Sequence, residues 1–190
     1  MSATWRISGA ILLAGCGGAN AGQSDPQACA PVATTEASMD VSRLAGEFVV
    51  RLVASSGAKR GTTTEGRLQL MPQDSAYRRL ELPDGSTSST YTLPLYGTAA
   101  VDFAAVGAVA PGDPVSADPA SPGVLVIERP GQVMLRVGSE ANRRGVRRFD
   151  GAFTVLRVQQ VTDNGFAGTW ESGVDLDRSG GHFCASRATG

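Results

Sequence analysis

Hydrolytic chemistry in this chain would have to centre on a single histidine, His182. Any serine or cysteine nucleophile that relied on an imidazole base would have to converge on that residue. The chain has no Gly-x-Ser-x-Gly segment and no His-Glu-x-x-His segment, which position nucleophiles and catalytic zinc in many hydrolases. We therefore predict that the protein is not an enzyme and needs no cofactor.

One segment near the C-terminus has the ligand pattern of a calcium loop. Residues 175–180 place oxygen-bearing side chains on Asp175, Asp177 and Ser179 and end in a glycine, which permits a sharp turn. Position twelve of such a loop would be Ser186, where an EF-hand requires a bidentate glutamate, and we expect strands on both sides. We prefer a polar hairpin loop, so these three residues stay only a calcium candidate and no metal is predicted.

Four arginines cluster around one glycine in a segment that we expect to be a loop. They are Arg143, Arg144, Arg147 and Arg148. Guanidinium groups bind planar anions through paired hydrogen bonds, so this cluster could hold a phosphate, a carboxylate or a lipopolysaccharide head group. The alternative is a solvated hairpin tip with no ligand.

The N-terminus has the pattern of an export signal. Arg6 supplies one positive charge, and the apolar stretch 7–14 that follows is far shorter than the roughly 20 residues of a membrane-spanning helix. The next residues, Leu13-Ala14-Gly15-Cys16, resemble the lipobox of bacterial lipoproteins. That resemblance implies that residues 1–15 are cleaved as a signal peptide and that Cys16 becomes the lipid-bearing first residue. A plain signal peptide or a buried apolar strand is the alternative.

The same resemblance implies an address and a first partner, the lipid bilayer. Gly17 stands where an aspartate would, by the family's sorting rule, favour inner-membrane retention, so we expect the outer membrane of the cell envelope. Residues 16–40 begin with small and polar side chains, and we predict a flexible tether there. The remaining residues, 41–190, suit one domain. Seventeen basic residues against eighteen acidic ones give no indication of a nucleic-acid partner.

With Cys16 assigned to the lipid, two cysteines remain. Cys29 and Cys184 would lie in an oxidising compartment, where a disulfide is the natural interpretation. This bond would join the start of the folded domain to its end. A redox or metal pair is the alternative, but the chain has no Cys-x-x-Cys spacing, and only His182 is a nearby nitrogen ligand.

The body of the chain alternates between apolar and polar residues with a period of two, which indicates half-buried strands. Glycine-bearing turns at 83–85, 129–131 and 163–165 indicate hairpins between consecutive strands. Strands are expected to begin near Leu44 and to include Leu68 and Leu70. Further strands are expected at 77–82, 90–96, 98–106, 124–129, 133–137, 153–161, 166–172 and 182–186.

About eight to ten short strands joined by hairpins predict a small closed or nearly closed antiparallel β-barrel, with a β-sandwich as the alternative. Two segments, 44–48 and 165–170, resemble the glycine, any residue, aromatic step of lipocalin and avidin-like barrels. In those barrels the glycine lets the backbone pass close and the aromatic ring plugs one end. We expect seven apolar residues to line the interior: Phe48, Leu68, Leu70, Phe153, Val155, Phe166 and Trp170.

Two functions are compatible with the predicted lipid-anchored β-barrel. A barrel of about eight strands has room for its own side chains or for one small ligand. The first hypothesis is therefore a lipid-anchored envelope protein that binds a small apolar ligand in the barrel. The second is a structural or interaction protein whose barrel is filled by its own side chains and whose loops contact an envelope protein. A packed interior without a pocket would exclude the first.

Overall fold

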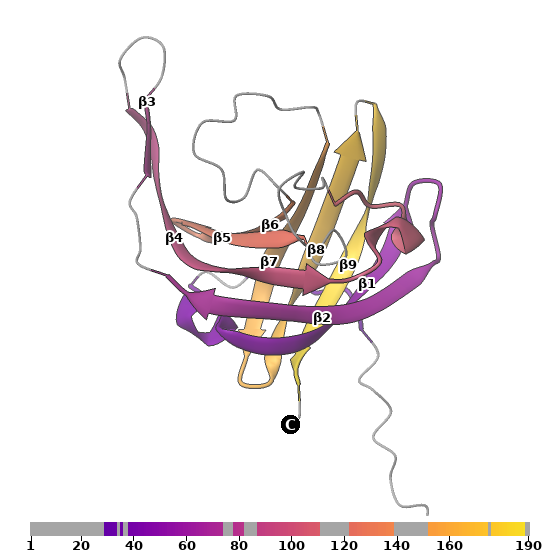
Figure 1. Cartoon of the computed structure of the whole chain (residues 1–190), viewed down its shortest axis with the longest axis horizontal. Helices are drawn as coiled ribbons and strands as arrows, with labels where there is room; N and C mark the ends of the chain where they lie inside the picture. The colour runs from indigo at the N-terminus through magenta and orange to yellow at the C-terminus, as the bar shows by residue number, and fades with distance from the viewer. Residues whose placement is uncertain are drawn as a thin grey trace, which may run out of the picture.

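The computed structural model describes residues 29–33, 35, 38–73, 78–81, 87–110, 122–138, 152–174 and 176–188. Within these ranges the chain forms nine strands and two short 3-10 helices (Figure 1). In chain order they are η1 (Val41–Leu44), β1 (Gly46–Ser56), β2 (Thr63–Pro72), β3 (Arg78–Glu81), β4 (Thr87–Ala100), η2 (Phe103–Val106), β5 (Gly123–Arg129), β6 (Gln132–Val137), β7 (Phe153–Thr162), β8 (Gly165–Val174) and β9 (Asp177–Arg187).

Eight of the described strands close into an antiparallel barrel. Around the ring the order is β1, β2, β4, β5, β6, β7, β8, β9, and the pairing of β9 with β1 completes it. β3 pairs with the first part of β4 and extends this strand as a hairpin outside the ring. The predicted all-β barrel is confirmed, and the sandwich is excluded because β2 pairs with β4 from Arg67 to Pro72. That pairing leaves no gap between two separate sheets.

The junction between β2 and β4 depends on a glycine. A Cβ atom added at Gly97 would lie 1.7 Å from the carbonyl oxygen of Gln69 on the facing strand. Only a residue without a side chain allows the two backbones to approach this closely. The glycine therefore permits the contact through which the barrel closes on itself.

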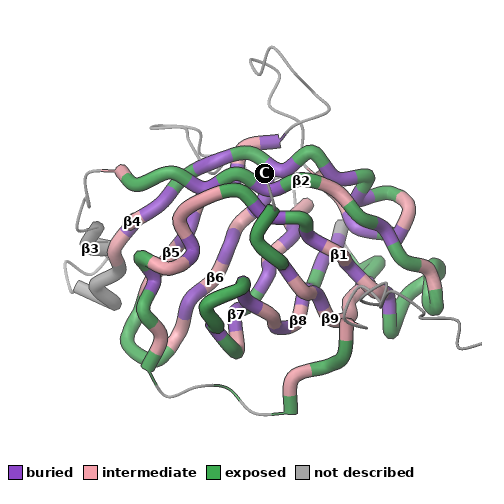
Figure 2. Tube along the Cα trace, turned by 90° about the horizontal axis from the view of Figure 1, so that it is seen from below, coloured by how far each residue is buried: buried purple, intermediate pink, exposed green. Residues whose placement is uncertain are grey.

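The period of two in the sequence becomes the alternation of buried and outward residues in the barrel wall. In β1, Phe48, Val50 and Leu52 are buried, whereas Glu47 and Val49 face outward. The same alternation repeats from strand to strand around the wall (Figure 2). The inward side chains merge into one core cluster that fills the barrel.

Some sequence expectations about the elements need correction. The two strands expected at 90–96 and 98–106 are one long strand, β4, followed by η2. The expected turn at 83–85 lies outside the described residues. The turns at 129–131 and 163–165 are confirmed as the β5–β6 and β7–β8 hairpins. In the described part of the chain, no helix is long and apolar enough to cross a bilayer.

Candidate functional site

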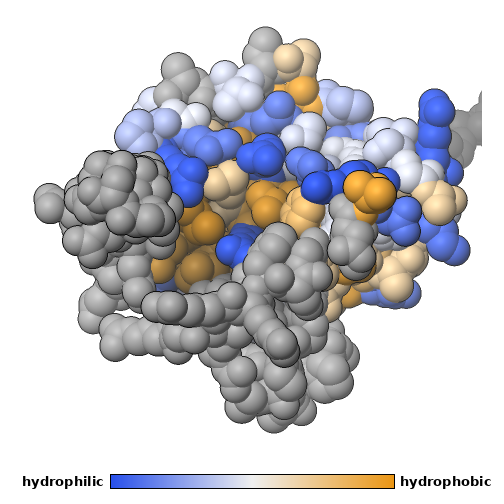
Figure 3. Space-filling view, turned by 90° about the horizontal axis from the view of Figure 1, so that it is seen from above, coloured by the Kyte–Doolittle hydropathy of each residue, from blue (hydrophilic) through white to orange (hydrophobic). Residues whose placement is uncertain are grey.

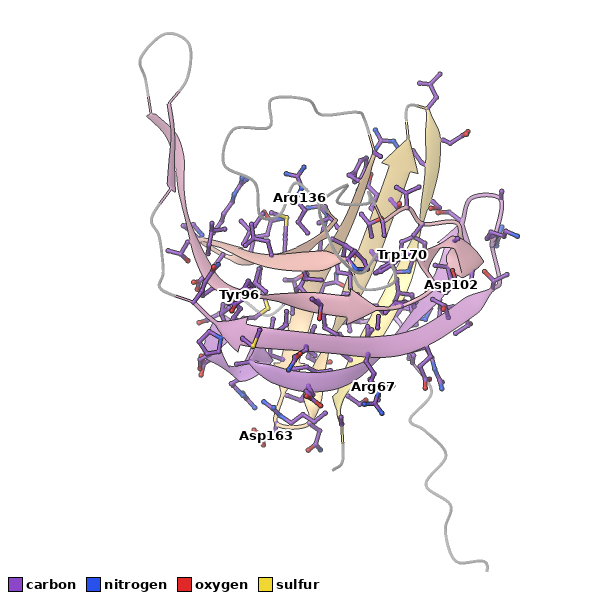
Figure 4. All side chains as sticks on the ribbon, viewed as in Figure 1. Arg67, Tyr96, Asp102, Arg136, Asp163 and Trp170 are labelled. Carbon is purple, nitrogen blue, oxygen red and sulfur yellow. A yellow bond between two sulfur atoms is a disulfide. The ribbon has the colours of Figure 1, made fainter. Side chains whose placement is uncertain are left out.

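The middle of the barrel is occupied by aromatic side chains. The ring of Phe166 lies edge-on to Phe48 and Phe183, with centroid distances of 5.0 Å and 6.0 Å. Trp170 is buried beside them, and its indole N–H donates to the carbonyl oxygen of Val53 at 3.1 Å (Figure 4). Edge-to-face packing of this kind fills the space of a small barrel and fixes the orientation of each ring. The interior prediction is thus confirmed for Phe48, Phe166 and Trp170, and also for the buried Leu68 and Leu70.

The prediction was wrong for two of the seven interior residues. Phe153 and Val155 are only half-buried and face outward, where the guanidinium of Arg178 lies over the Phe153 ring. The inward positions of β7 are instead taken by Thr154 and Leu156. The odd-numbered and the even-numbered residues of β7 both include apolar side chains. The alternation in the sequence therefore did not show which of the two faces points into the barrel. Thr154 can face inward because its hydroxyl has hydrogen-bond partners there.

The barrel end next to η1 is closed by the segment that precedes β1. Leu44 is fully buried there, and Gly46 has a φ of +131°, a conformation that favours glycine where the chain turns into the strand. Arg187 at the end of β9 lies over the Phe48 ring, 5.0 Å from its centroid. The Arg187 guanidinium also donates to the carbonyl oxygens of Arg43 and Ala45, at 2.9 Å and 3.2 Å. One side chain thus fastens the closing segment to the last strand.

The opposite end is crossed by the chain itself. After β4, η2 places Phe103 and Val106 in the core, and residues 107–109 then run past β9, β8 and β7. We call residues 107–109 the strap. Ala108, in its middle, is buried and belongs to the core cluster. The strap therefore occupies the opening through which a ligand would enter the barrel.

Three hydroxyl groups hold the strap; of these, only Ser179 was singled out from the sequence, and then as a calcium candidate. Ser172 accepts a hydrogen bond from the amide of Val109 at 2.9 Å, and the Thr154 hydroxyl contacts the Val109 carbonyl oxygen. Ser179 donates to the carbonyl oxygen of Gly107 at 2.5 Å. Thr154 and Ser172 are fully buried, and their hydroxyl oxygens lie 2.8 Å apart. Inward hydroxyls in an apolar barrel thus satisfy a peptide group that would otherwise lack partners.

Open clefts lie at both ends of the barrel. One of about 650 Å³ lies beside η2 and is lined mainly by apolar residues, including Phe103, Val109 and Pro122. Asp102 also lines it, but its carboxylate accepts the amide of Ala105 and so begins η2 (Figure 4). A second cleft, of about 360 Å³, lies beside η1. Both clefts lie at the plugged ends of the barrel, outside the packed core.

The disulfide between Cys29 and Cys184 is present, with the two Cα atoms 5.6 Å apart. It joins the segment before η1 to β9. His182, two residues earlier on β9, lies with its Nε2 3.0 Å from the carbonyl oxygen of Cys29. The only histidine of the sequence therefore contacts the attached N-terminal segment. The chain is fastened to the barrel already at residue 29, within the stretch 16–40 that was predicted as a tether.

The remaining candidate residues do not form a site in the described chain. Asp177 and Ser179 belong to β9, where the Ser179 hydroxyl points to the strap, and Asp175 lies outside the described residues. Among the described residues, no three His, Cys, Asp or Glu side chains gather closely enough to bind a metal. The four arginines at 143–148 also lie outside the described ranges. One Ser-x-x-Lys spacing, Ser56 to Lys59, occurs at the β1–β2 turn, but the Ser56 hydroxyl donates to the carbonyl oxygen of Gly180.

Comparisons with known proteins assign no family. No protein-family model matches the chain, and no curated protein matches it. A solved structure described as "EF1p2_mFAP2b bound to DFHBI" is similar to 80% of this chain and 100% of its own, with 8% sequence identity and a TM-score of 0.41. A likeness this weak carries no argument about function, so the fold described above rests on the strand pairing alone.

Proposed function

We propose that this protein is a lipid-anchored lipoprotein of the bacterial cell envelope whose barrel works through its outer surface. The observation that carries the proposal is the strap, because Ala108 and the Val109 peptide group fill the opening of an already packed barrel. A protein that carried a ligand inside would need this space. With both ends closed by the chain itself, the outer wall is the surface left for recognition.

The anchor at Cys16 rests on the resemblance of residues 13–16 to a lipobox. Cys29 follows Cys16 by thirteen positions in the sequence. At about 3.5 Å per residue, this length lets the barrel stand no more than ~45 Å from the lipid. The disulfide makes the attachment point a fixed place on the β9 wall. Gly17 after the cysteine favours the outer membrane as the address.

The test of the anchor compares the wild-type chain with Cys16→Ser in a bacterial host supplied with a labelled fatty acid. The wild-type protein should incorporate the label and fractionate with the outer membrane. The Cys16→Ser protein should remain unlabelled and leave the membrane fraction. An unlabelled wild-type protein in the cytosol would overturn the proposal.

A small apolar ligand bound at the mouth of the barrel is the second candidate function, and the apolar cleft of about 650 Å³ beside η2 favours it. Titration with the apolar dye N-phenylnaphthylamine separates the two candidates. The filled barrel predicts no saturable rise in fluorescence. Saturable binding that Phe103→Trp at the cleft abolishes, with the fold intact, would favour the carrier.

A further inference from the structure

A small polar cleft lies on the outer wall of the barrel, over β2 and its neighbours β1 and β4. In the view from above, apolar residues line a hollow of the surface (Figure 3), whereas this cleft also offers charged and hydrogen-bonding groups. Its volume is about 200 Å³, and the buried Phe48 and Leu68 form part of its lining. We call it the wall cleft. Its polar lining residues, all of them exposed, are Glu47, Arg67, Gln69 and Thr98.

The strand register brings these polar residues together from three strands. Glu47 on β1 pairs with Gln69 on β2, which in turn pairs with Thr98 on β4. Arg67 lies two residues before Gln69, and therefore on the same face of β2, where it pairs with Ala100. Ala100 also lines the wall cleft. Because its side chain is a single methyl group, it leaves room for a ligand beside the arginine.

The guanidinium of Arg67 is not used inside the protein. It points away from the barrel (Figure 4), and within the described part of the chain it has no hydrogen bond, ion pair or ring contact. The neighbouring arginine of this wall is different, because Arg51 donates two hydrogen bonds, of 2.8 Å and 3.0 Å, to the carboxylate of its direct partner Glu65. Glu65 is thus occupied by Arg51, and Arg67 is left free to bind an anion.

A second charge borders the wall cleft without pairing with the first. Glu47 and Arg67 are diagonal neighbours across β1 and β2, yet no ion pair joins them in the described chain. In the same part of the chain, the Glu47 carboxylate accepts one long hydrogen bond of 3.4 Å from the Gln69 amide. A simple anion at Arg67 would be repelled by Glu47, and a simple cation at Glu47 would be repelled by Arg67. The pair of charges therefore favours a ligand that carries both signs.

We propose that the wall cleft binds a small zwitterion with a carboxylate and an ammonium group, of the size of an α-amino acid. The carboxylate would accept hydrogen bonds from the Arg67 guanidinium and the Thr98 hydroxyl, and the ammonium group would donate to Glu47. Since a water molecule takes about 30 Å³, a volume of about 200 Å³ holds roughly seven non-hydrogen atoms, as many as a small amino acid has. Water screens these exposed groups, so we expect a Kd on the order of 1 mM that rises with salt.

The test titrates the full chain with three matched probes and follows the side-chain N–H signals of Arg67 and Gln69 by ¹H–¹⁵N NMR. L-Alanine carries both charges, propionate lacks the ammonium group, and ethylammonium lacks the carboxylate. L-Alanine should shift these signals saturably and bind about tenfold more tightly than either of the other probes. Added salt should weaken its binding.

Single substitutions separate the roles of the two charges. Arg67→Gln should weaken L-alanine at least about tenfold, whereas Arg60→Gln at the exposed β1–β2 turn is the matched control and should leave binding unchanged. Glu47→Gln should change two probes in opposite directions: L-alanine should bind more weakly and propionate more tightly, because the repulsion of the carboxylate is removed. Ala100→Leu fills the wall cleft without changing its charge and should abolish binding of L-alanine.

Three results would overturn the proposal. The first is the absence of a saturable shift with L-alanine at about twenty times the expected Kd. The second is equal binding of L-alanine and propionate, which would make the wall cleft a plain carboxylate site. The third is binding of L-alanine that Arg67→Gln leaves unchanged. The titration needs neither a membrane nor an acyl chain, so its outcome is independent of the acylation test at Cys16.

Discussion

Removal of the Ser172 hydroxyl should loosen the strap without opening the barrel wall. In Ser172→Ala, the Val109 amide loses its acceptor, and the buried Thr154 hydroxyl loses a neighbour 2.8 Å away. Ser172 is fully buried, and its hydroxyl is the acceptor that the structure shows for the Val109 amide. A donor left without a partner in such a place costs about 1–3 kcal/mol. We therefore expect the free energy of unfolding to fall by ~2 kcal/mol.

Hydrogen exchange at the Val109 amide reports the loss directly. A change of ~2 kcal/mol in the free energy of local opening corresponds to roughly thirtyfold faster exchange. Exchange at the amide of Leu135, in the middle of β6, should accelerate no more than the fall in the global free energy of unfolding requires. Ser56→Ala is the control, since this exposed hydroxyl donates to a carbonyl at the same barrel end and its removal should cost under about 0.5 kcal/mol.

Unchanged exchange at Val109 in Ser172→Ala would refute the reasoning, because the strap would then be held by something other than these hydroxyls. A larger increase at Leu135 than at Val109 would also contradict it, since the hydroxyl would then act mainly on the barrel wall and not on the strap. If the variant binds N-phenylnaphthylamine while the wild-type protein does not, the strap is the barrier that excludes ligands from the interior.

Three further predictions concern stability. Cys29→Ala with Cys184→Ala opens a loop of 155 residues and should lower the free energy of unfolding by at most ~5 kcal/mol in urea titration; no loss would mean that the bond does not restrict the unfolded chain. Gly97→Ala would place a methyl group 1.7 Å from the Gln69 carbonyl, so the soluble folded yield should collapse, whereas normal yield would exclude the close approach. Hydrogen bonds from the Ser42 side chain and amide hold the pKa of the Asp40 carboxyl below its usual range, so this stabilisation is present above the unfolded pKa and is lost as pH falls through the lower folded pKa. Asp40→Asn should therefore reduce the loss of stability between neutral and acidic pH, and an unchanged pH dependence of the free energy of unfolding would contradict the assignment.

The parts of the fold that sequence alone predicted are those that depend on local periodicity. In β1 the apolar residues Phe48, Val50 and Leu52 share one face, whereas the other face carries the charged Glu47 and Arg51, so a single register buries the apolar set. In β7 both faces contain apolar residues, and the face with Thr154 points inward, where its hydroxyl contacts the Val109 carbonyl of the strap and the Ser172 hydroxyl of β8. The contact of Thr154 with Val109 joins residues that are far apart in the sequence, so the alternation of apolar and polar residues in β7 could not predict it.

The hydroxyl site could have been suspected from one signal. Ser172 has the same strand parity as Phe166 and Trp170, which were expected inside, so an inward polar group followed from the same pattern. Its partner could not be named, because the strap has no periodicity and its position depends on the end of β4. The outward apolar residues of β5 were missed for a related reason. Leu125 and Ile127 alternate with the equally apolar Val124 and Val126, so the sequence of β5 is typical of a strand buried on both faces.

The energy of opening argues for recognition on the outer wall. To admit a ligand, the barrel would have to break the three strap hydrogen bonds, at roughly 1 kcal/mol each, and withdraw Phe103 and Val106 from the core, at about 1.5–3 kcal/mol each. The sum is about 6–9 kcal/mol, which would weaken the apparent affinity of an interior ligand by a factor of roughly 10⁴ to 10⁶. A small apolar ligand would spend most of its binding free energy on opening the barrel. A partner bound to the outer wall needs no such rearrangement, so the same side chains that close the barrel favour recognition at its surface.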